Sequence, residues 1–207
     1  MLDFLIQLDT KIFLFLNGLH SPILDEIMWI ISEKETWYPF YLILICLLIY
    51  IYRKKSPFII LGLAVLITLA DQISVEVFKK GFERLRPSHN EALKNMIHLV
   101  NNYHGGKYGF VSSHAANTFA GATFISGLVD IKALRWGMFI WAVIVSYSRI
   151  YLGVHYPGDI LGGAILGILL GLMIVFILKT FVIRDSEYEY GLPITVCKTK
   201  LCQPKLF

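Results

Sequence analysis

The chain has 207 residues, of which 56% are hydrophobic and 16% charged, and its mean hydropathy is +0.62. This balance excludes an ordinary soluble domain and predicts one integral membrane domain. The formal net charge of +4 is small, and no basic run with interleaved aromatic residues indicates a nucleic-acid surface. Two of the three cysteines are spaced C-x4-C near the C-terminus, without the partner residues that a metal site needs.

The N-terminal stretch carries two short amphipathic segments. Residues 2–19 mix apolar clusters with three charged residues, and residues 22–31 carry two acidic residues. The second segment is also too short to cross about 30 Å of hydrocarbon. We therefore expect residues 1–34 to form helices that lie in the membrane interface. They lack the pattern of a cleaved signal peptide, so we expect them in the mature protein.

Residues 37–178 contain the uncharged apolar runs of a helical membrane bundle. The first run is framed by aromatic residues at both ends and by the basic stop Arg53-Lys54-Lys55, as membrane spans are. The predicted spans are residues 37–52, 56–78, 112–129, 136–152 and 160–178, with a turn at 130–135. The predicted fold is all-α, a polytopic membrane bundle with about five spanning helices and six at most. It forms a single domain, residues 1–184, and residues 185–207 are predicted to be a polar cytoplasmic tail.

Basic residues predict the orientation of these helices. Three groups fall on one side of the membrane if five helices cross alternately: Arg53-Lys54-Lys55, Lys132 with Arg135, and Lys179 with Arg184. An excess of lysine and arginine marks the cytoplasmic side. The opposite side then receives the long loop after residue 78 and the stretch 149–159. The basic residues of this loop run against the charge rule, and an anion-binding site would explain them.

Three separate segments place reactive side chains on that extracytoplasmic face. They are Lys79 with Arg86, Ser112-Ser113-His114, and Arg149 with His155 and Asp159. His155 and Asp159 are four residues apart, so at a helix start a carboxylate can hold the imidazole through Nδ1–H. Arg149 suits bidentate recognition of a phosphate. Taken singly, each segment has a structural explanation: a His–Asp pair, a lipid-headgroup patch or a helix-capping serine. Their convergence indicates a site for phosphoryl chemistry.

The spacing of these segments resembles the type-2 phosphatidic acid phosphatase superfamily, which includes bacterial membrane lipid phosphatases and shares its site with vanadium haloperoxidases. The matching patterns are K-x6-R-P, Ser-x-His at a helix start, and S-R-x5-H-x3-D, and the resemblance covers about residues 37–178. The chain departs from the family at Val111-Ser112-Ser113-His114, where Pro-Ser-Gly-His is usual. We interpret Ser113 as a tolerated variant, because its backbone N–H is still available to an anion.

The resemblance and the residue types imply the same division of roles. Lys79, Arg86 and Arg149 would neutralise the phosphoryl oxygens, with Ser112 and the N–H groups of residues 113 and 114 completing the cradle. His155 would attack phosphorus and form a phosphohistidine, while Asp159 fixes its tautomer. His114 would protonate the leaving oxygen. No carboxylate cluster suited to Mg²⁺ accompanies them, so we predict metal-independent hydrolysis without a cofactor.

The expected substrate is a membrane lipid phosphate or diphosphate, bound at the outer face of a bacterial inner membrane. Undecaprenyl diphosphate is the first choice within the family. Lipid A, phosphatidylglycerophosphate and phosphatidic acid are alternatives. A non-catalytic membrane module that binds anionic lipids is a less favoured hypothesis, because it would need the basic residues but not both histidines. The sequence does not indicate an oligomeric state.

Overall fold

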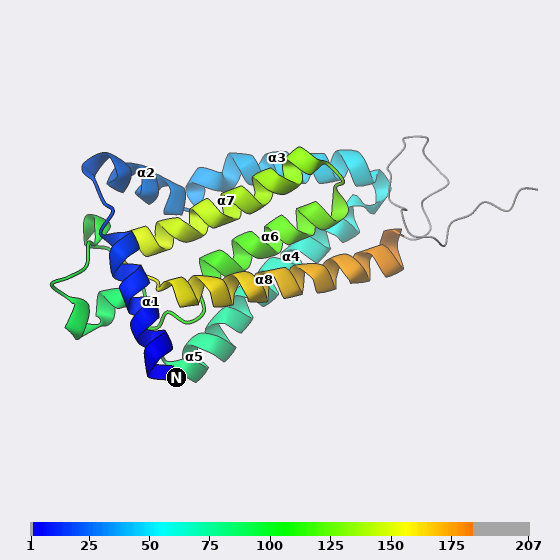
Figure 1. The fold of residues 1–207 in the computed structure, drawn as a ribbon. Coiled ribbons are helices and arrows are strands. Elements are labelled where there is room, and N and C mark those ends of the chain that lie inside the picture. Colours follow the sequence, from blue (N-terminus) through cyan, green and yellow to red (C-terminus); the bar gives the residue numbers. More distant parts are fainter. Residues whose placement is uncertain (1, 184–207) are drawn as a thin grey trace, which may run out of the picture.

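A computed structural model describes residues 2–183, which are helical with connecting loops and contain no strand (Figure 1). The α-helices are α1 (Leu2–Asn17), α2 (Pro22–Ser32), α3 (Tyr38–Tyr52), α4 (Ser56–Gln72), α5 (Lys80–Phe82), α6 (Ser113–Leu128), α7 (Lys132–Tyr151) and α8 (Pro157–Leu178). Two π-helical segments, Ile73–Lys79 and Lys179–Ile183, extend α4 and α8. The short 3-10 turns are Glu35–Trp37, Arg53–Lys55, Pro87–His89, Glu91–Leu93 and Val100–Asn102. The all-α prediction is confirmed for this part of the chain.

The long helices lie where the apolar runs predicted them, with one clear difference. Helix α7 begins at Lys132, inside the predicted turn at 130–135. Arg135 N–H donates to the Ile131 carbonyl at 3.0 Å, and Arg135 pairs with Asp130 at 3.1 Å. Both charged side chains are exposed, so the first turn of the helix can extend beyond the apolar run.

Two helical stretches, Glu35–Phe82 and Pro157–Ile183, are long and apolar enough to cross a membrane. The first contains both α3 and α4, which the turn Arg53–Lys55 separates. Helix α6 has only 16 residues and is rich in small and polar side chains, which lowers its hydropathy. The membrane character of the chain is therefore supported, whereas the count of about five spans stays a prediction.

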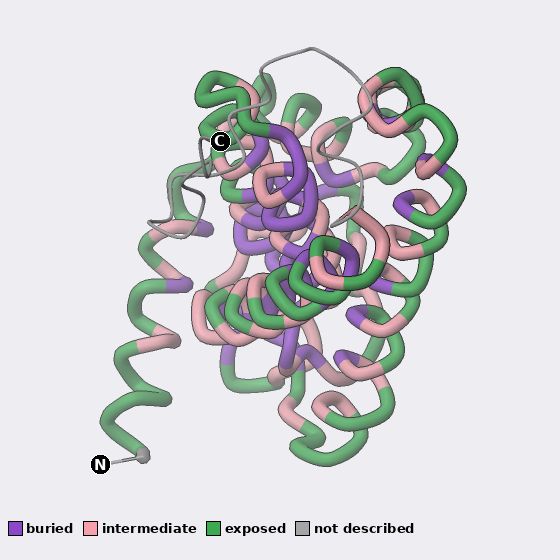
Figure 2. Tube along the Cα trace, turned by 90° about the vertical axis from the view of Figure 1, so that its right-hand side faces the viewer, coloured by how far each residue is buried: buried purple, intermediate pink, exposed green. Residues whose placement is uncertain are grey.

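Helices α6 and α8 pack so closely that their backbones touch. A Cβ atom built on Gly167 would lie 2.2 Å from the Ala116 carbonyl oxygen, and one on Gly163 would lie 2.5 Å from that of Ser112. Small residues permit such an approach, which favours helix association in lipid. Figure 2 shows buried positions gathered inside the bundle and exposed ones outside. The contact brings the N-terminal ends of α6 and α8 side by side.

The two N-terminal helices cover that same end of the bundle. Helix α1 runs across the long helices in Figure 1, and Asn17 at its end donates to the Tyr151 carbonyl at 2.8 Å. Its outer surface exposes large apolar side chains, including Phe4, Leu5 and Phe15. This arrangement suits a helix lying in the membrane interface, which stays a prediction. The predicted cytoplasmic tail, residues 185–207, lies outside the described residues.

Candidate active site

The two helix starts that build the site are fixed by local interactions. Ser112 is the N-cap of α6, and its hydroxyl accepts from the Ala115 N–H at 3.5 Å. The Ser112 N–H donates to the Asp159 carbonyl at 3.0 Å, which joins α6 to the first turn of α8. Pro157 begins α8, where its fixed φ suits the first helical position. Ser112, predicted to contact phosphate, is fully buried and serves as a helix cap in the structure.

His155 lies in the short connection between α7 and α8 and is 1% exposed. Its Nδ1 is 3.4 Å from Asp159 Oδ2, at the long end of a hydrogen bond, and its ring also bonds the Gly109 backbone. Burial lowers the pKa of His155 well below its ordinary range, and the positive charges of Arg86 and Arg149 lower it further. The imidazole is therefore neutral at neutral pH and keeps a ring-nitrogen lone pair for attack.

Asp159 makes two hydrogen bonds that are shorter than its contact with His155. Its Oδ2 accepts from the Tyr156 N–H at 3.0 Å, and its Oδ1 accepts from Arg84 Nη1 at 2.8 Å. The side chain is fully buried. The predicted His155–Asp159 pair is present, but the carboxylate is oriented mainly by the backbone and by Arg84.

Arg149 is 4% exposed at the end of α7. One guanidinium nitrogen donates to Ser32 Oγ and another to Tyr103 Oη at 3.3 Å. Arg149 Nε, in contrast, is buried without a hydrogen-bond partner among residues 2–183. The burial of the charged group and its contacts with Ser32 and Tyr103 hold the guanidinium in one orientation.

Lys79 and Arg86 approach from the other side of the site. Lys79 Nζ donates to Ser113 Oγ at 2.7 Å, and Ser113 Oγ lies 2.6 Å from Ser74 Oγ. Arg86 is 8% exposed and uses Nε to bond the Tyr108 carbonyl at 3.1 Å. Burial lowers the pKa of Arg86, with nearby Arg149 as the next cause. Ser113 has no positive φ, so its replacement of the usual glycine requires no strained backbone.

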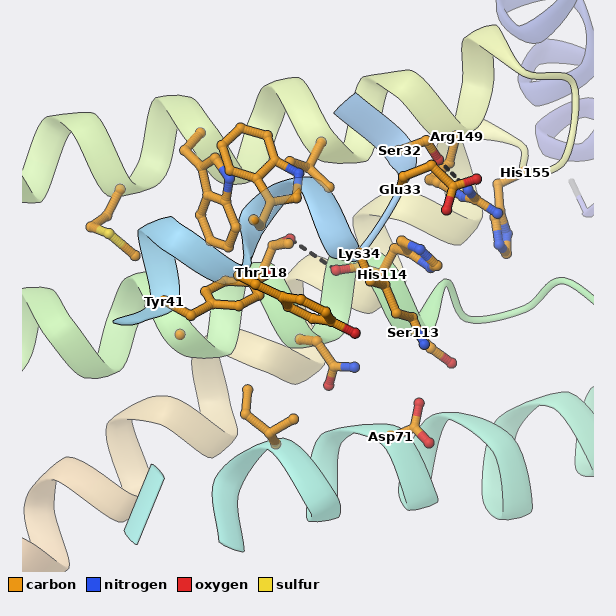
Figure 3. Close-up of a pocket in the computed structure, with 18 of the residues that line it drawn as sticks. Ser32, Glu33, Lys34, Tyr41, Asp71, Ser113, His114, Thr118, Arg149 and His155 are labelled. Atoms are coloured by element: carbon orange, nitrogen blue, oxygen red, sulfur yellow. Dashed lines mark hydrogen bonds between the residues drawn. The ribbon is translucent and has the colours of Figure 1, made fainter. Parts of the chain in front are cut away.

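These groups line one end of a cavity of about 550 Å³ (Figure 3). Lys79, Arg86, His114, Arg149 and His155 line the polar end. The apolar end lies between α3, α4, α6 and α7 and is lined by Leu44, Ile45, Leu63, Ile67, Ile125 and Met138. Figure 3 shows His114 next to Arg149 and His155, with Tyr41 further along the cavity. The cavity therefore offers a cationic end for a phosphate and an apolar end for a lipid chain.

The sequence did not identify four residues that support this site. Arg84 donates to Asp159 and also to Asp9, whereas Ser32 and Tyr103 accept from Arg149. In the sequence, Arg84 is only one of several basic residues in the loop after residue 78. Ser32 and Arg149 are 117 residues apart, and no periodicity connects such distant positions. Among the described residues, no group of three or more His, Cys, Asp or Glu side chains is placed to hold a metal ion.

The helical bundle and the cationic, histidine-containing end of its apolar cavity define a phosphatase that acts on membrane lipids. The comparisons with known proteins agree. The model of the PAP2 superfamily matches residues 58–182, and the chain belongs to this superfamily. The prediction of the family and of a phosphatase is thereby confirmed.

Individual relatives are similar over most of the chain. A lipid A 4'-phosphatase of Bacteroides thetaiotaomicron is 40% identical over 179 residues, which cover 86% of this chain and 80% of the relative. An undecaprenyl-diphosphatase of Sulfolobus acidocaldarius is 28% identical over 184 residues, covering 88% and 84%. The crystal structure of Aquifex aeolicus LpxE superimposes with a TM-score of 0.65 at 26% identity, covering 82% of this chain and 95% of that one.

Proposed function

We propose that the chain is a lipid A 4'-phosphatase, which hydrolyses a phosphate monoester of an acylated glucosamine lipid and releases inorganic phosphate. The observation that carries the phosphatase assignment is the cavity whose polar end gathers His114, Arg149 and His155. The 40% identity to a lipid A 4'-phosphatase supports the substrate. Undecaprenyl diphosphate, the first choice from the sequence, becomes the second candidate, because the undecaprenyl-diphosphatase that is similar over most of the chain is only 28% identical.

The proposed reaction has two steps. Lys79, Arg86 and Arg149 bind the phosphoryl oxygens, with the N–H groups of residues 113 and 114, and stabilise charge in the transition state. The neutral His155 attacks phosphorus in line as the bond to the sugar oxygen breaks. His114, whose imidazolium form is stabilised by the negative charge of the bound phosphate, donates a proton to that oxygen. Water then attacks the phosphohistidine, His114 takes the proton from this water, and inorganic phosphate leaves.

The first test is a turnover panel with the purified protein in detergent. We expect phosphate release from lipid A to exceed release from undecaprenyl diphosphate, phosphatidylglycerophosphate and phosphatidic acid. His155→Gln should abolish release from all four without removing the protein from the membrane. Unchanged turnover in that variant would refute the mechanism. Equal lack of turnover in both proteins, with retained binding of anionic vesicles, would favour the non-catalytic module.

Metal-free chemistry is part of the proposal. The donors at the polar end of the cavity are cationic, so they can neutralise phosphoryl charge themselves. Turnover by the purified protein should therefore persist in excess EDTA. Loss of turnover in EDTA that Mg²⁺ restores would refute this part.

We further propose that the site faces the extracytoplasmic side of the inner membrane. The basic residues on the opposite connections support this orientation. Met96 lies in the loop after α5 and is 63% exposed. In a variant whose own three cysteines are replaced, Met96→Cys should react with an impermeant thiol reagent in spheroplasts. Reaction only after the membrane is opened would reverse the orientation.

A further inference from the structure

Arg84 bridges two carboxylates that come from opposite ends of the chain. Its Nη1 donates to Asp159 Oδ1 at 2.8 Å, and its Nη2 donates to Asp9 Oδ2 at 2.6 Å. Asp9 lies on α1 and Asp159 in the first turn of α8. The side chains of Arg84 and Asp9 are 25% and 15% exposed, and that of Asp159 is fully buried. The contact is therefore a partly buried ion-pair network.

Two further contacts tie α1 to the same turn of α8. Asp9 Oδ1 accepts from the Gly158 N–H at 2.8 Å. The Arg84 guanidinium lies 4.2 Å from the centre of the Tyr156 ring, within the range of a cation–π interaction. Gly158 and Tyr156 flank the start of the helix that carries Asp159. Asp9 thus holds this turn both directly and through Arg84.

The network determines which oxygen of Asp159 faces the histidine. Arg84 binds Oδ1, which leaves Oδ2 for the Tyr156 N–H and for His155 Nδ1. Each carboxylate receives one bond from Arg84, and the planar guanidinium keeps its two donors at a fixed angle, which a point charge cannot do. Without Arg84, the carboxylate could rotate, and its buried charge would lose its strongest partner. The orientation of the His155 ring would change with it.

We infer that Arg84 and Asp9 are positioning residues of the active site, and that α1 is a working part of the phosphatase. They orient Asp159, and Asp159 in turn orients the ring of the attacking His155. This inference rests on the proposed function for its kinetic consequence. The competing explanation is that the network only attaches α1 to the bundle.

The test compares four variants with the wild-type protein. Arg84→Met removes the bridge, Arg84→Lys keeps the charge without the fork, and Asp9→Asn keeps an acceptor for Gly158 but weakens the hold on Arg84. Lys80→Met is the matched control, because Lys80 lies nearby in an exposed ion pair with Glu76 at 2.6 Å. Rapid mixing with labelled substrate gives the rate and the amplitude of phosphoenzyme formation, and vanadate inhibition gives anion affinity.

We expect Arg84→Met to slow phosphoenzyme formation per competent site by about 10- to 100-fold, as a misplaced reacting group does. The rate of phosphoenzyme formation in Arg84→Lys should lie between those of Arg84→Met and wild type. This rate should be several-fold lower than wild type in Asp9→Asn and unchanged in Lys80→Met. Vanadate affinity should stay within about threefold in all variants, because Lys79, Arg86 and Arg149 are intact. A purely structural role predicts a lower amplitude at an unchanged rate, and that result would overturn the inference.

A second readout separates this inference from the proposed function. Nitrogen NMR of ¹⁵N-histidine-labelled protein reports the ring of His155, assigned by the signal that His155→Gln removes. Arg84→Met and Asp9→Asn should move this signal, and Lys80→Met should not. If the wild-type protein hydrolyses no lipid phosphate but the signal moves, the positioning role stands and the proposed function fails. An unmoved signal in both variants would overturn the positioning role.

Discussion

Replacing Arg149 by lysine isolates the guanidinium geometry from its charge. The side chain is almost fully buried and donates to Ser32 and Tyr103 through its two terminal nitrogens. Arg149 also lines the polar end of the cavity. A lysine ammonium is a single point, so it cannot keep both protein contacts and still present a donor to phosphate. Arg149→Lys should therefore impair catalysis although the charge is retained.

The size of this effect follows from the contact that is lost. One hydrogen bond to a charged group contributes about 1.5–3 kcal/mol. If it forms fully in the transition state, its loss lowers kcat/KM by about 10- to 150-fold. Arg149→Met also removes the charge and should lower kcat/KM further, on the order of 10²- to 10³-fold below wild type.

The assay is release of phosphate from lipid A by purified protein in detergent, with apparent melting temperature as the control for folding. Arg135→Lys is the matched control, because Arg135 lies at the other end of α7 in an exposed pair with Asp130. It should behave as wild type, since exposed ion pairs contribute little. If Arg149→Lys retains kcat/KM within twofold of wild type, Arg149 does not bind the phosphoryl group as argued.

Three further predictions test the packing, the variant motif and the electrostatics. Gly167→Ala should lower the apparent melting temperature, because its Cβ would overlap the Ala116 carbonyl and overpacking costs about 1–3 kcal/mol. Gly137→Ala in α7 is the control and should not lower it, because a Cβ there would meet no other atom within 4 Å. Equal effects would contradict the close α6–α8 contact. Ser113→Gly should reduce kcat/KM about fivefold, although it restores the family's usual residue. The variant removes the acceptor of Lys79 Nζ, and the loss of one hydrogen bond corresponds to about 1 kcal/mol of transition-state stabilisation. Unchanged turnover would show that Ser113 is dispensable. Because the pKa of folded His155 lies well below the value of about 6.5 expected for the unfolded chain, acidification from pH 7.5 to 5.5 protonates only the unfolded state at this position and lowers stability. The melting temperature of His155→Gln should fall less over that pH range than that of the wild-type protein. An equal fall in both proteins would contradict the lowered pKa of His155.

Much of the fold was predictable because apolar runs and helix boundaries are local features. The aromatic and basic frame of residues 37–55 and the uncharged apolar run of residues 160–178 indicated helices that the structure contains. The start of α7 was missed because charged residues at a helix end resemble a turn. The number of spans cannot be read from hydropathy alone, because α6 packs through small residues and carries polar ones.

The candidate site was predictable as far as its residues follow a spaced pattern. His114, Arg149 and His155 line one cavity as the spacing of the motifs suggested. The supporting contacts were not predictable, since they join positions far apart in the chain. Arg84 and Asp159 are 75 residues apart, and Asp9 and Gly158 are 149 apart. Such contacts depend on how α1 and the loop after α5 pack against the start of α8, and a local sequence pattern does not specify this packing.

The proposed mechanism depends above all on His155 as the nucleophile. The measurement is acid-free trapping of the purified protein during turnover of lipid A labelled with ³²P at the 4' position, followed by peptide mapping. We expect one labelled site, at His155, whose label is lost in acid and kept in base. His155→Gln should carry no label, and His114→Ala should form and lose it slowly. Label on another residue, or full turnover in His155→Gln, would show that His155 is not the nucleophile.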